Sequence, residues 1–537
     1  MKDQDTLSNL INIKVILSYD TIFKDNKTLN RLLKNNIKIN HLILLSCLSY
    51  HDQEEISHKI KNWSSSHIKE VIMNKEKIED YYFFSRHHKL LLLKNLLIHL
   101  MPQIKLNAIN KDFKFLVKLI LKVHDFEVEN DNARHSISIA SLYYYKDNYL
   151  HQFIRTNYIF LQNNKLNVYK EIFNKIYNIK LEDYLFVILN IISFYEERKI
   201  FLEGNLDKLD IKYWYFDLEK IDENYFNLFK NVLDLISFTI IEGKNFSNET
   251  IDDFHNFDLF RNKPFIKLDE YKYIPIDGTY IKDLLFNNLY YKTLDLLDEK
   301  TKLNFMGDFG YEFEKYSSSL IEFVSIKKIS YEYISEFTFK YKTNNLKSPD
   351  AMLYDKENNV LLFIEVKSSR YLNSIYEYNT INDSQYKLKI KPWKQLYESV
   401  EKIYTIKEKD IIKDETKNKQ IKDLINKNPT LMFLVVSMND IPISADIYEI
   451  KDLTGKDISK AFFSMNIEAF EEFCNIISSD YDYSFSQILG GYNQYKKRMS
   501  VKTYLSKIKK HNHIKNNEFN KFIIDTYNNF VNSHNSQ

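Results

Sequence analysis

The stretch LKSPDAMLYDKENNVLLFIEVKSS, residues 346–369, predicts a β-hairpin. Two apolar runs flank the polar turn DKENN (355–359), a pattern typical of two antiparallel strands joined by a short loop. The second run contains Glu365 and Lys367 near its end. Because successive side chains of a strand alternate between faces, these two charges share one face. We expect the hairpin to bring Asp350, at the start of the first strand, close to both.

The predicted cluster of Asp350, Glu365 and Lys367 is chemically unusual. Two carboxylates that are partly buried together repel each other unless a cation lies between them. Mg²⁺ prefers oxygen ligands, keeps several waters and accepts phosphate oxygens, so two carboxylates and a phosphodiester would complete its shell. The lysine can hold an attacking water and stabilise charge on phosphoryl oxygens. The alternative is a solvent-exposed ion pair at the end of a strand, which is common on protein surfaces.

The elements around the hairpin predict a mixed α/β sheet. A helix, three strands, a second helix and a buried strand follow one another, and a strand, a long helix and another strand indicate a crossover connection. Two further helical segments follow. The expected ranges are helix 309–324, strands 329–341, 350–355 and 360–367, helix 391–406, strand 431–438, and helices within 459–478 and 484–531.

The first half of the chain has a different pattern of apolar residues. Its apolar residues recur at spacings of three and four, as in 224–238, which predicts a mostly α-helical half. Between 261 and 285, prolines, a glycine and short apolar alternations gather. We therefore predict a helical domain over 1–265, with a sensor, regulatory or assembly role, and an α/β domain over 266–537.

The hairpin residues resemble the signature of the PD-(D/E)XK nuclease superfamily, with Pro349 and Asp350 followed by Glu365, Val366 and Lys367. The resemblance implies a restriction-endonuclease-like αβββαβ mixed sheet, here with extra C-terminal helices. It further implies that Asp350 and Glu365 bind Mg²⁺ or Mn²⁺, that the Val366 carbonyl is a further ligand, and that Lys367 serves the attacking water. In this family the same acids and lysine cut phosphodiester bonds.

The resemblance also suggests two further positions, one on each predicted helix that flanks the three strands. In the family, an acid from the helix before the sheet often joins the metal site, and the string GYEFE (310–314) offers Glu314, with Glu312 as its rival. The helix after the lysine strand often adds a glutamine or lysine to the site. Here the string KPWKQLYESV supplies Lys394 and Gln395.

Positive charge gathers in two places. Residues 483–517 contain no Asp or Glu, and lysines alternate there with tyrosines. Such cations neutralise phosphates and such rings stack on unpaired bases, although a solvated helix face would have the same composition. A second group follows the predicted strand 360–367 and would hold a phosphate backbone in register. The predicted nucleic-acid contacts are Arg370, Lys391, Lys394, Lys496, Lys497 and Arg498.

Composition limits the class of protein. A net charge of +2 excludes a surface that is positive throughout, so a nucleic-acid surface must be local. Cys47 and Cys474 are far apart in sequence and match no zinc or disulfide pattern. We find neither a signal-peptide pattern nor an apolar run long enough for a membrane span, which predicts a cytoplasmic protein without membrane association.

These features together predict a Mg²⁺-dependent endonuclease. The resemblance favours DNA as substrate and a role in bacterial restriction or antiphage defence. Because no phosphate-binding loop is present, any energy-driven step would require a separate NTPase or sensor subunit. Two alternatives stay open: an RNase with the same site, and a nucleic-acid-binding or scaffold protein that has lost catalysis. The oligomeric state is not predicted.

Overall fold

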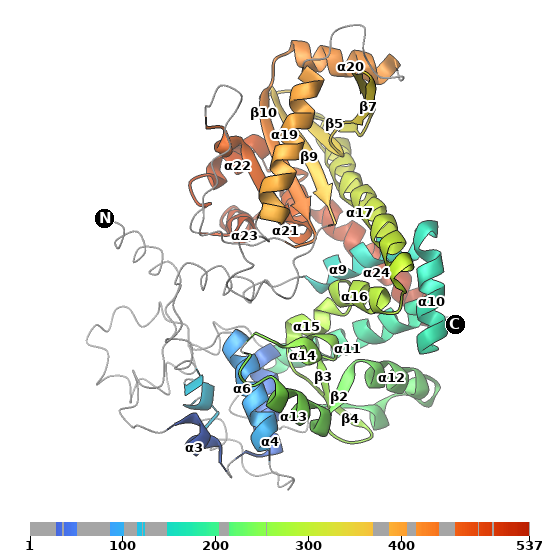
Figure 1. The fold of residues 1–537 in the computed structure, drawn as a ribbon, viewed down its shortest axis with the longest axis vertical. Coiled ribbons are helices and arrows are strands. Elements are labelled where there is room, and N and C mark those ends of the chain that lie inside the picture. The colour runs from blue at the N-terminus through green and yellow to red at the C-terminus, as the bar shows by residue number, and fades with distance from the viewer. Residues whose placement is uncertain are drawn as a thin grey trace, which may run out of the picture. The chain divides into compact units, whose positions relative to one another are not determined.

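In the computed structural model the chain forms two compact units (Figure 1). Unit 1 contains the described residues up to 153 and those of 168–297, and unit 2 contains 154–167 and the described residues from 298 onward. The residues that the structure describes are 28–34, 37–50, 86–100, 115–116, 118–120, 122–123, 148–202, 214–253, 255–368, 386–404, 415–439, 457–481, 483–496 and 499–535.

Unit 1 combines helices with a small sheet. Its strands pair in the order β1-β4-β3-β2, with β2 parallel to β3 and the other pairs antiparallel. The helices are α3 (Leu29–Leu33), α4 (Ile39–Tyr50), α6 (Arg86–His99), α9 (Tyr149–Thr156), α10 (Asn167–Tyr177), α11 (Leu181–Leu202), α12 (Glu223–Leu235), α13 (Ile240–Glu249), α14 (Asp258–Asn262), α15 (Gly278–Asp283) and α16 (Asn287–Asp295). The strands are β1 (Phe216–Asp217), β2 (Ser237–Thr239), β3 (Phe265–Lys267) and β4 (Lys272–Pro275). The chain passes from unit 1 to unit 2 within α9, and α10 begins at the return.

Two buried polar contacts tie the helices of unit 1 to its loops. The fully buried Lys94 of α6 donates hydrogen bonds of 2.8 and 2.9 Å to the carbonyls of Thr250 and Asp253, which satisfies a charge that would otherwise be expensive to bury. Arg86 at the start of α6 pairs at 2.8 Å with Asp277, whose carboxylate also caps α15. These contacts fix α6 against the loops on either side of the small sheet.

Unit 2 is built around a five-stranded sheet. Its helices are α17 (Glu299–Lys327), α19 (Lys391–Tyr404), α20 (Glu415–Asn426), α21 (Ile467–Ile477), α22 (Phe485–Tyr492), α23 (Val501–His511) and α24 (Asn517–Asn535), with π-helical turns at Asn157–Leu161 and Tyr386–Ile390. Its strands are β5 (Tyr331–Ser335), β6 (Thr338–Tyr341), β7 (Asn344–Lys347), β8 (Ala351–Asp355), β9 (Val360–Lys367), β10 (Thr430–Ser437) and β11 (Phe462–Asn466).

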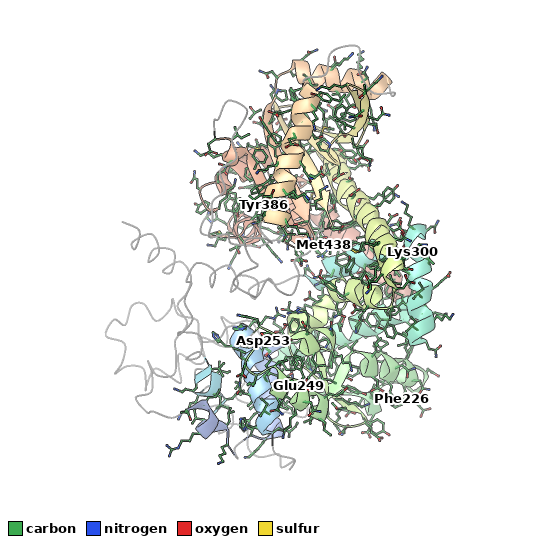
Figure 2. All side chains as sticks on the ribbon, viewed as in Figure 1. Phe226, Glu249, Asp253, Lys300, Tyr386 and Met438 are labelled. Atoms are coloured by element: carbon green, nitrogen blue, oxygen red, sulfur yellow. The ribbon has the colours of Figure 1, made fainter. Side chains whose placement is uncertain are left out.

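The strands of the large sheet follow the order β11-β10-β9-β8-β5. β5, β8 and β9 are antiparallel neighbours, whereas β9, β10 and β11 are parallel. Lys367 pairs with Ser437, so β9 and β10 end at the same edge, next to Met438 (Figure 2). Parallel strands need a crossover, and α19 and α20 lie in the connection between β9 and β10.

One face of this sheet packs against α19, which lies across it (Figure 1). Phe363 of β9 and Phe433 of β10 are buried there against Leu396 and Val400 of α19. The hairpin β6–β7 pairs separately from the large sheet and covers the edge of this core with Phe339. Glu365 lies two residues beyond Phe363 and therefore shares its face.

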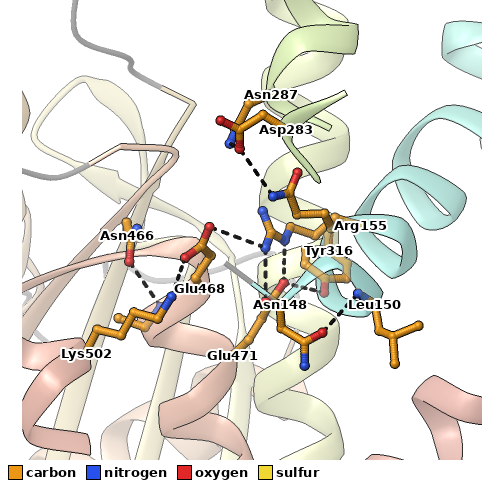
Figure 3. A network of polar contacts seen from close by, with 12 residues as sticks. Asn148, Leu150, Arg155, Asp283, Asn287, Tyr316, Asn466, Glu468, Glu471 and Lys502 are labelled. Carbon is orange, nitrogen blue, oxygen red and sulfur yellow. Dashed lines mark hydrogen bonds and ion pairs between the residues drawn. The ribbon is translucent and has the colours of Figure 1, made fainter. Parts of the chain in front are cut away.

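The α21 side of unit 2 contains a buried charge network (Figure 3). Arg155 pairs with Glu471 of α21 through Nε at 2.7 Å, and Tyr316 of α17 donates to the same carboxylate at 2.8 Å. Glu468 lies 3.9 Å from Arg155 and 2.8 Å from the Lys502 amine of α23. Burial raises the pKa of Glu468 to about 8 although Lys502 favours its charged form. The network ties the segment after the crossing in α9 to three helices that are distant in sequence.

The prediction of a helical first half and an α/β second half is confirmed at this coarse level. The described part of this mostly helical half also holds the small β1–β4 sheet, and β3 and β4 fall within the stretch 261–285 where short apolar alternations gather. Unit 1 runs to Leu297, beyond the predicted boundary at 265, because β3, β4, α15 and α16 pack with the helices before them. Among the described residues, no helix is both long and apolar enough to cross a bilayer.

Candidate metal centre

The strand β9 extends beyond its neighbour β8. The last pair between them is Ala351 with Ile364, so Glu365, Val366 and Lys367 have no partner on β8. Asp350 takes the place of a partner strand, because its Oδ2 accepts a 2.7 Å hydrogen bond from the Val366 N–H. The N–H and carbonyl of one strand residue point to the same side, so the Val366 carbonyl also faces this open end. The hairpin thus brings Asp350 to the end of β9, as its turn and alternation predict.

Glu365 and Lys367 lie together on the face of β9 that continues from the core under α19. The Lys367 amine donates to Glu365 Oε1. The Glu365 side chain is 17% exposed and that of Lys367 is 32% exposed, so solvent reaches both groups only partly. A carboxylate and an ammonium group are therefore held together, partly exposed, at the edge of the apolar core under α19.

The helix α17 passes the same end of β9. A Cβ on Gly310 would meet the Ser368 Oγ at 3.2 Å, so the glycine allows the helix to approach the residue that follows β9. Glu314, one turn further along, is half-buried and lies within electrostatic reach of Lys367 and Glu365. Its rival Glu312 is 1% exposed and lies 3.8 Å from Lys315 on the same helix. Glu314 is thus the α17 acid that adjoins the cluster.

Burial and the repulsion between neighbouring carboxylates raise the pKa values of the acids in this cluster. Burial, and next the charge of Glu365, raise the pKa of Asp350 to about 8, although the Val366 N–H favours the charged form. Burial also raises the pKa of Glu314, which Lys367 partly offsets. Burial disfavours a protonated Lys367, but Glu365, Asp350 and Glu314 outweigh it and raise the pKa of its amine. Lys367 is therefore a cation at neutral pH, and burial together with the charge of Glu365 favours the protonated form of Asp350 when no cation is bound.

The oxygen atoms of these side chains are the kind of ligand that a hard divalent cation prefers. Asp350 and Glu365 offer carboxylate oxygens, and the repulsion that raises the pKa of Asp350 is the one that a cation between them would relieve. Within the described ranges, no group of three or more His, Cys, Asp or Glu side chains is arranged to hold a metal. Asp350 and Glu365 are the carboxylates that could hold such an ion, with Glu314 close by, and water, the Val366 carbonyl and a phosphate could complete its shell.

Comparison with known proteins does not assign the chain. No family model, curated protein or solved structure matches it. The resemblance to a nuclease, and the roles that it implies for the site residues, therefore stay predictions.

The predicted residues of α19 lie on its solvent side. Lys391, Lys394 and Gln395 are exposed, and the Lys394 amine lies 5.9 Å from the Tyr386 ring. In the described part of the chain, Gln395 makes no hydrogen bond to Asp350, Glu365 or Lys367. Its predicted catalytic role therefore has no support from contacts, whereas the two lysines are accessible to phosphate.

The Lys496 amine, a predicted phosphate contact, makes an internal contact. It donates a 2.7 Å hydrogen bond to the Phe462 carbonyl and lies 4.0 Å from the Phe463 ring, so it is held at the start of β11 while the residue stays partly exposed. Burial lowers the pKa of this amine to about 7, which also weakens its attraction for phosphate. Arg370, Lys497 and Arg498 lie outside the described residues.

Sequence reasoning missed two residues beside the site. Lys347, at the end of β7, pairs at 2.8 Å with Glu336, and its charge acts on Glu314 and Asp350. Ser348 accepts from the Phe337 N–H through Oγ at 2.9 Å and donates its own N–H to the Phe337 carbonyl at 2.9 Å. A hairpin signal at YKTNN, just before Pro349, could have revealed them.

Two glycines of α17 test whether the helix must approach β9 closely. A Cβ on Gly307 would meet open space, so Gly307→Ala should raise the free energy of unfolding by about 0.5–1 kcal/mol. Gly310→Ala should gain less because its methyl group would press on Ser368, and Gly310→Val should lose about 1–3 kcal/mol. Chemical denaturation of the three variants measures this. Equal gains for both alanine variants would contradict the close contact.

Proposed function

We propose that unit 2 is a metal-dependent nuclease that hydrolyses phosphodiester bonds, with DNA as the favoured substrate. One observation carries the proposal: Asp350 and Glu365 converge beyond the end of β8 with Lys367 beside them, and the pKa of Asp350 is raised to about 8. Acidic side chains whose pKa is shifted and that lie next to a cationic side chain are typical of functional sites.

The architecture supports the same proposal. The order α17, β5, β8, β9, α19, β10 follows the αβββαβ order that the PD-(D/E)XK resemblance implies, with the β6–β7 hairpin inserted between β5 and β8, α20 between α19 and β10, and β11 added after β10. Extra C-terminal helices, α21 to α24, follow as expected. A restriction-endonuclease-like fold is therefore part of the proposal, as is a role in bacterial restriction or antiphage defence with a separate NTPase or sensor subunit.

The residues divide the chemistry among them. Asp350 and Glu365 would hold Mg²⁺ or Mn²⁺, and the bound ion would supply Lewis-acid stabilisation of charge on the phosphoryl oxygens. Lys367 stays protonated, so it donates a hydrogen bond and positive charge to the phosphate and does not act as a base. Glu314, whose raised pKa lies nearer neutrality, is the acceptor for a proton.

The balanced reaction is a hydrolysis. The water oxygen forms a bond to phosphorus while the bond from phosphorus to the leaving oxygen breaks. The proton that the water loses goes to Glu314, and the leaving oxygen takes a proton from solvent. Because Glu314 belongs to the rigid helix α17, its place as base depends on the contact between Gly310 and Ser368.

Parallel cleavage assays test the proposal. Purified full-length protein is incubated with plasmid DNA, single-stranded DNA and RNA, each with Mg²⁺, Mn²⁺ or EDTA. We expect metal-dependent cleavage of DNA and none in EDTA. Cleavage of RNA alone would favour the RNase alternative. Absence of cleavage of all three substrates with either metal would contradict a nuclease and favour the scaffold alternative.

Metal binding should depend on pH because Asp350 must lose its proton to become a ligand. Its pKa of about 8 means that the proton is still bound at pH 6.5 and mostly lost at pH 8.5. The apparent affinity for Mn²⁺ should rise roughly 25-fold over this interval, if one proton is released. Calorimetric titration at the two pH values measures it, and a pH-independent affinity would contradict the assignment of Asp350.

A further inference from the structure

The hairpin β6–β7 forms a two-stranded ribbon beside the candidate site. Its strands pair from Thr338 with Lys347 to Tyr341 with Asn344, so only Lys342 and Thr343 form the turn. Lys342 has a φ of 55°, a left-handed conformation that usually takes glycine or asparagine. A lysine at this position is unfavourable locally, which is typical of functional loops.

The two faces of the ribbon differ in character. Side chains alternate along each strand, and Phe339 and Leu346 point into the core under α19. The opposite face carries four exposed side chains: Thr338, Lys340, Asn345 and Lys347. Residues 338–348 include three lysines and no Asp or Glu. The outward face, with the Lys342 turn, is thus a basic polar surface, which we call the ribbon face.

The ribbon face is continuous with the candidate site. Lys347 lies on it, and its charge acts on both Glu314 and Asp350. Ser348 closes the base of the ribbon by its two hydrogen bonds with Phe337, and Pro349 and Asp350 follow directly. A phosphate at the cluster would therefore have Lys347 as a neighbour, and Lys340 lies about 7 Å further along, two residues of strand away.

The helix α23 offers a weaker surface. Two of its lysines are used internally, because Lys502 pairs with Glu468 at 2.8 Å and Lys509 with Glu472 at 3.0 Å. Lys340 and Lys342 are exposed, and neither forms an ion pair in the described part of unit 2. Lys507 and Lys510 of α23 are exposed as well, but the ribbon is the surface that runs directly through Ser348 and Pro349 into Asp350, which favours it as the place where a polyanion continues from the site.

We propose that the ribbon face binds the phosphate backbone of the nucleic acid next to the bond that is cut. This inference rests on the proposed nuclease function and extends it, because it assigns substrate binding to Lys340 and Lys342, next to Lys347, which pairs with Glu336 at 2.8 Å. Contacts to phosphates fix the position of a substrate without reading its sequence. The ribbon thus sets which phosphodiester reaches Asp350 and Glu365.

The test is binding of a fluorescein-labelled DNA duplex in EDTA, measured by anisotropy at several salt concentrations. The variant is Lys340→Gln/Lys342→Gln in the full-length protein, and both side chains are exposed, so the fold should persist. Each lost phosphate contact removes close to one unit from the slope of log affinity against log salt, so we expect a slope lower by about two and binding roughly tenfold weaker at low salt.

The matched control is Lys427→Gln. Lys427 is exposed in the turn before β10, at the opposite end of the sheet from Lys367, and its amine lies 5.0 Å from the Tyr354 ring. This variant should bind with the wild-type slope. If the double variant also keeps the wild-type affinity and slope while the wild type cuts DNA, the ribbon proposal is wrong and the nuclease stands. If the wild type neither binds nor cuts nucleic acid, both fail.

Discussion

Replacing Asp350 by Asn should abolish cleavage, with a rate at least about 10³-fold below the wild type, since metal-based charge stabilisation contributes several kcal/mol. The amide keeps the size of the carboxylate and an oxygen that can accept from the Val366 N–H at its 2.7 Å position. It removes one of two anionic ligands. Cleavage of a labelled oligonucleotide under single-turnover conditions measures the loss.

Lys367→Met separates catalysis from metal binding. The variant keeps the length of the side chain and removes the ammonium that donates to Glu365. Cleavage should fall about 10²–10³-fold because a donor to the phosphoryl oxygens is lost. Mn²⁺ should bind at least as tightly as in the wild type, since the amine no longer competes for Glu365. Loss of Mn²⁺ binding in this variant would show that the lysine has another role.

Stability provides the control for Asp350→Asn. The folded-state pKa of Asp350, about 8, lies above that of an unfolded aspartate, so ionisation of this group destabilises the metal-free fold as pH rises from about 4 to 8. Asp350→Asn should therefore be more stable than the wild type at pH 8.5 without metal. A variant that is inactive and also less stable at that pH would point to misfolding instead of lost chemistry.

The second large effect concerns the buried network of unit 2. Arg155→Met should destabilise the protein by about 3–5 kcal/mol because it leaves the buried Glu471 carboxylate without its guanidinium partner, while Tyr316 still donates to it. Arg155 and Glu471 are each 1% exposed, so water cannot replace the lost partner. Hydrogen exchange should become faster in α21 peptides, and chemical denaturation of the full chain should shift accordingly.

The double variant Arg155→Met/Glu471→Leu distinguishes an unpaired charge from lost packing. Removing both charges of the pair leaves neither one buried without the other, so the double variant should be more stable than Arg155→Met alone. Lys502→Met should cost less than Arg155→Met, because the Lys502 side chain is 25% exposed and Glu468 can take up a proton instead. If Arg155→Met lost less than about 1 kcal/mol, the network would not be a stabilising element.

The sequence predicts the hairpin well because its signals are local. Alternation within 350–367 and the DKENN turn determine which residues share a face, and Asp350 indeed contacts the backbone of Val366. The strand β11 was missed, because the run AFFSMNIEAF passes from strand to helix without glycine or proline. The local sequence pattern therefore reveals strands that are separated by turns, but it does not reveal a strand that continues directly into a helix.

Partners that are distant in sequence could not be predicted. Arg155 and Glu471 are 316 residues apart, and nothing local marks them as a pair. Lys496 looked like a surface cation because its neighbours are basic, yet the carbonyl of Phe462 binds it. Lysine is amphipathic, and its burial depends on tertiary contacts that composition does not encode.

Calorimetric titration of Mn²⁺ into the metal-free protein at pH 8.5 tests the central claim most directly. It compares the wild type with Asp350→Asn, Glu365→Gln and Glu357→Gln, the last being an exposed acid in the turn between β8 and β9. We predict that the wild type and Glu357→Gln bind Mn²⁺ equally and that both site variants lose this binding. Equal binding by all four proteins would show that Asp350 and Glu365 do not hold the metal.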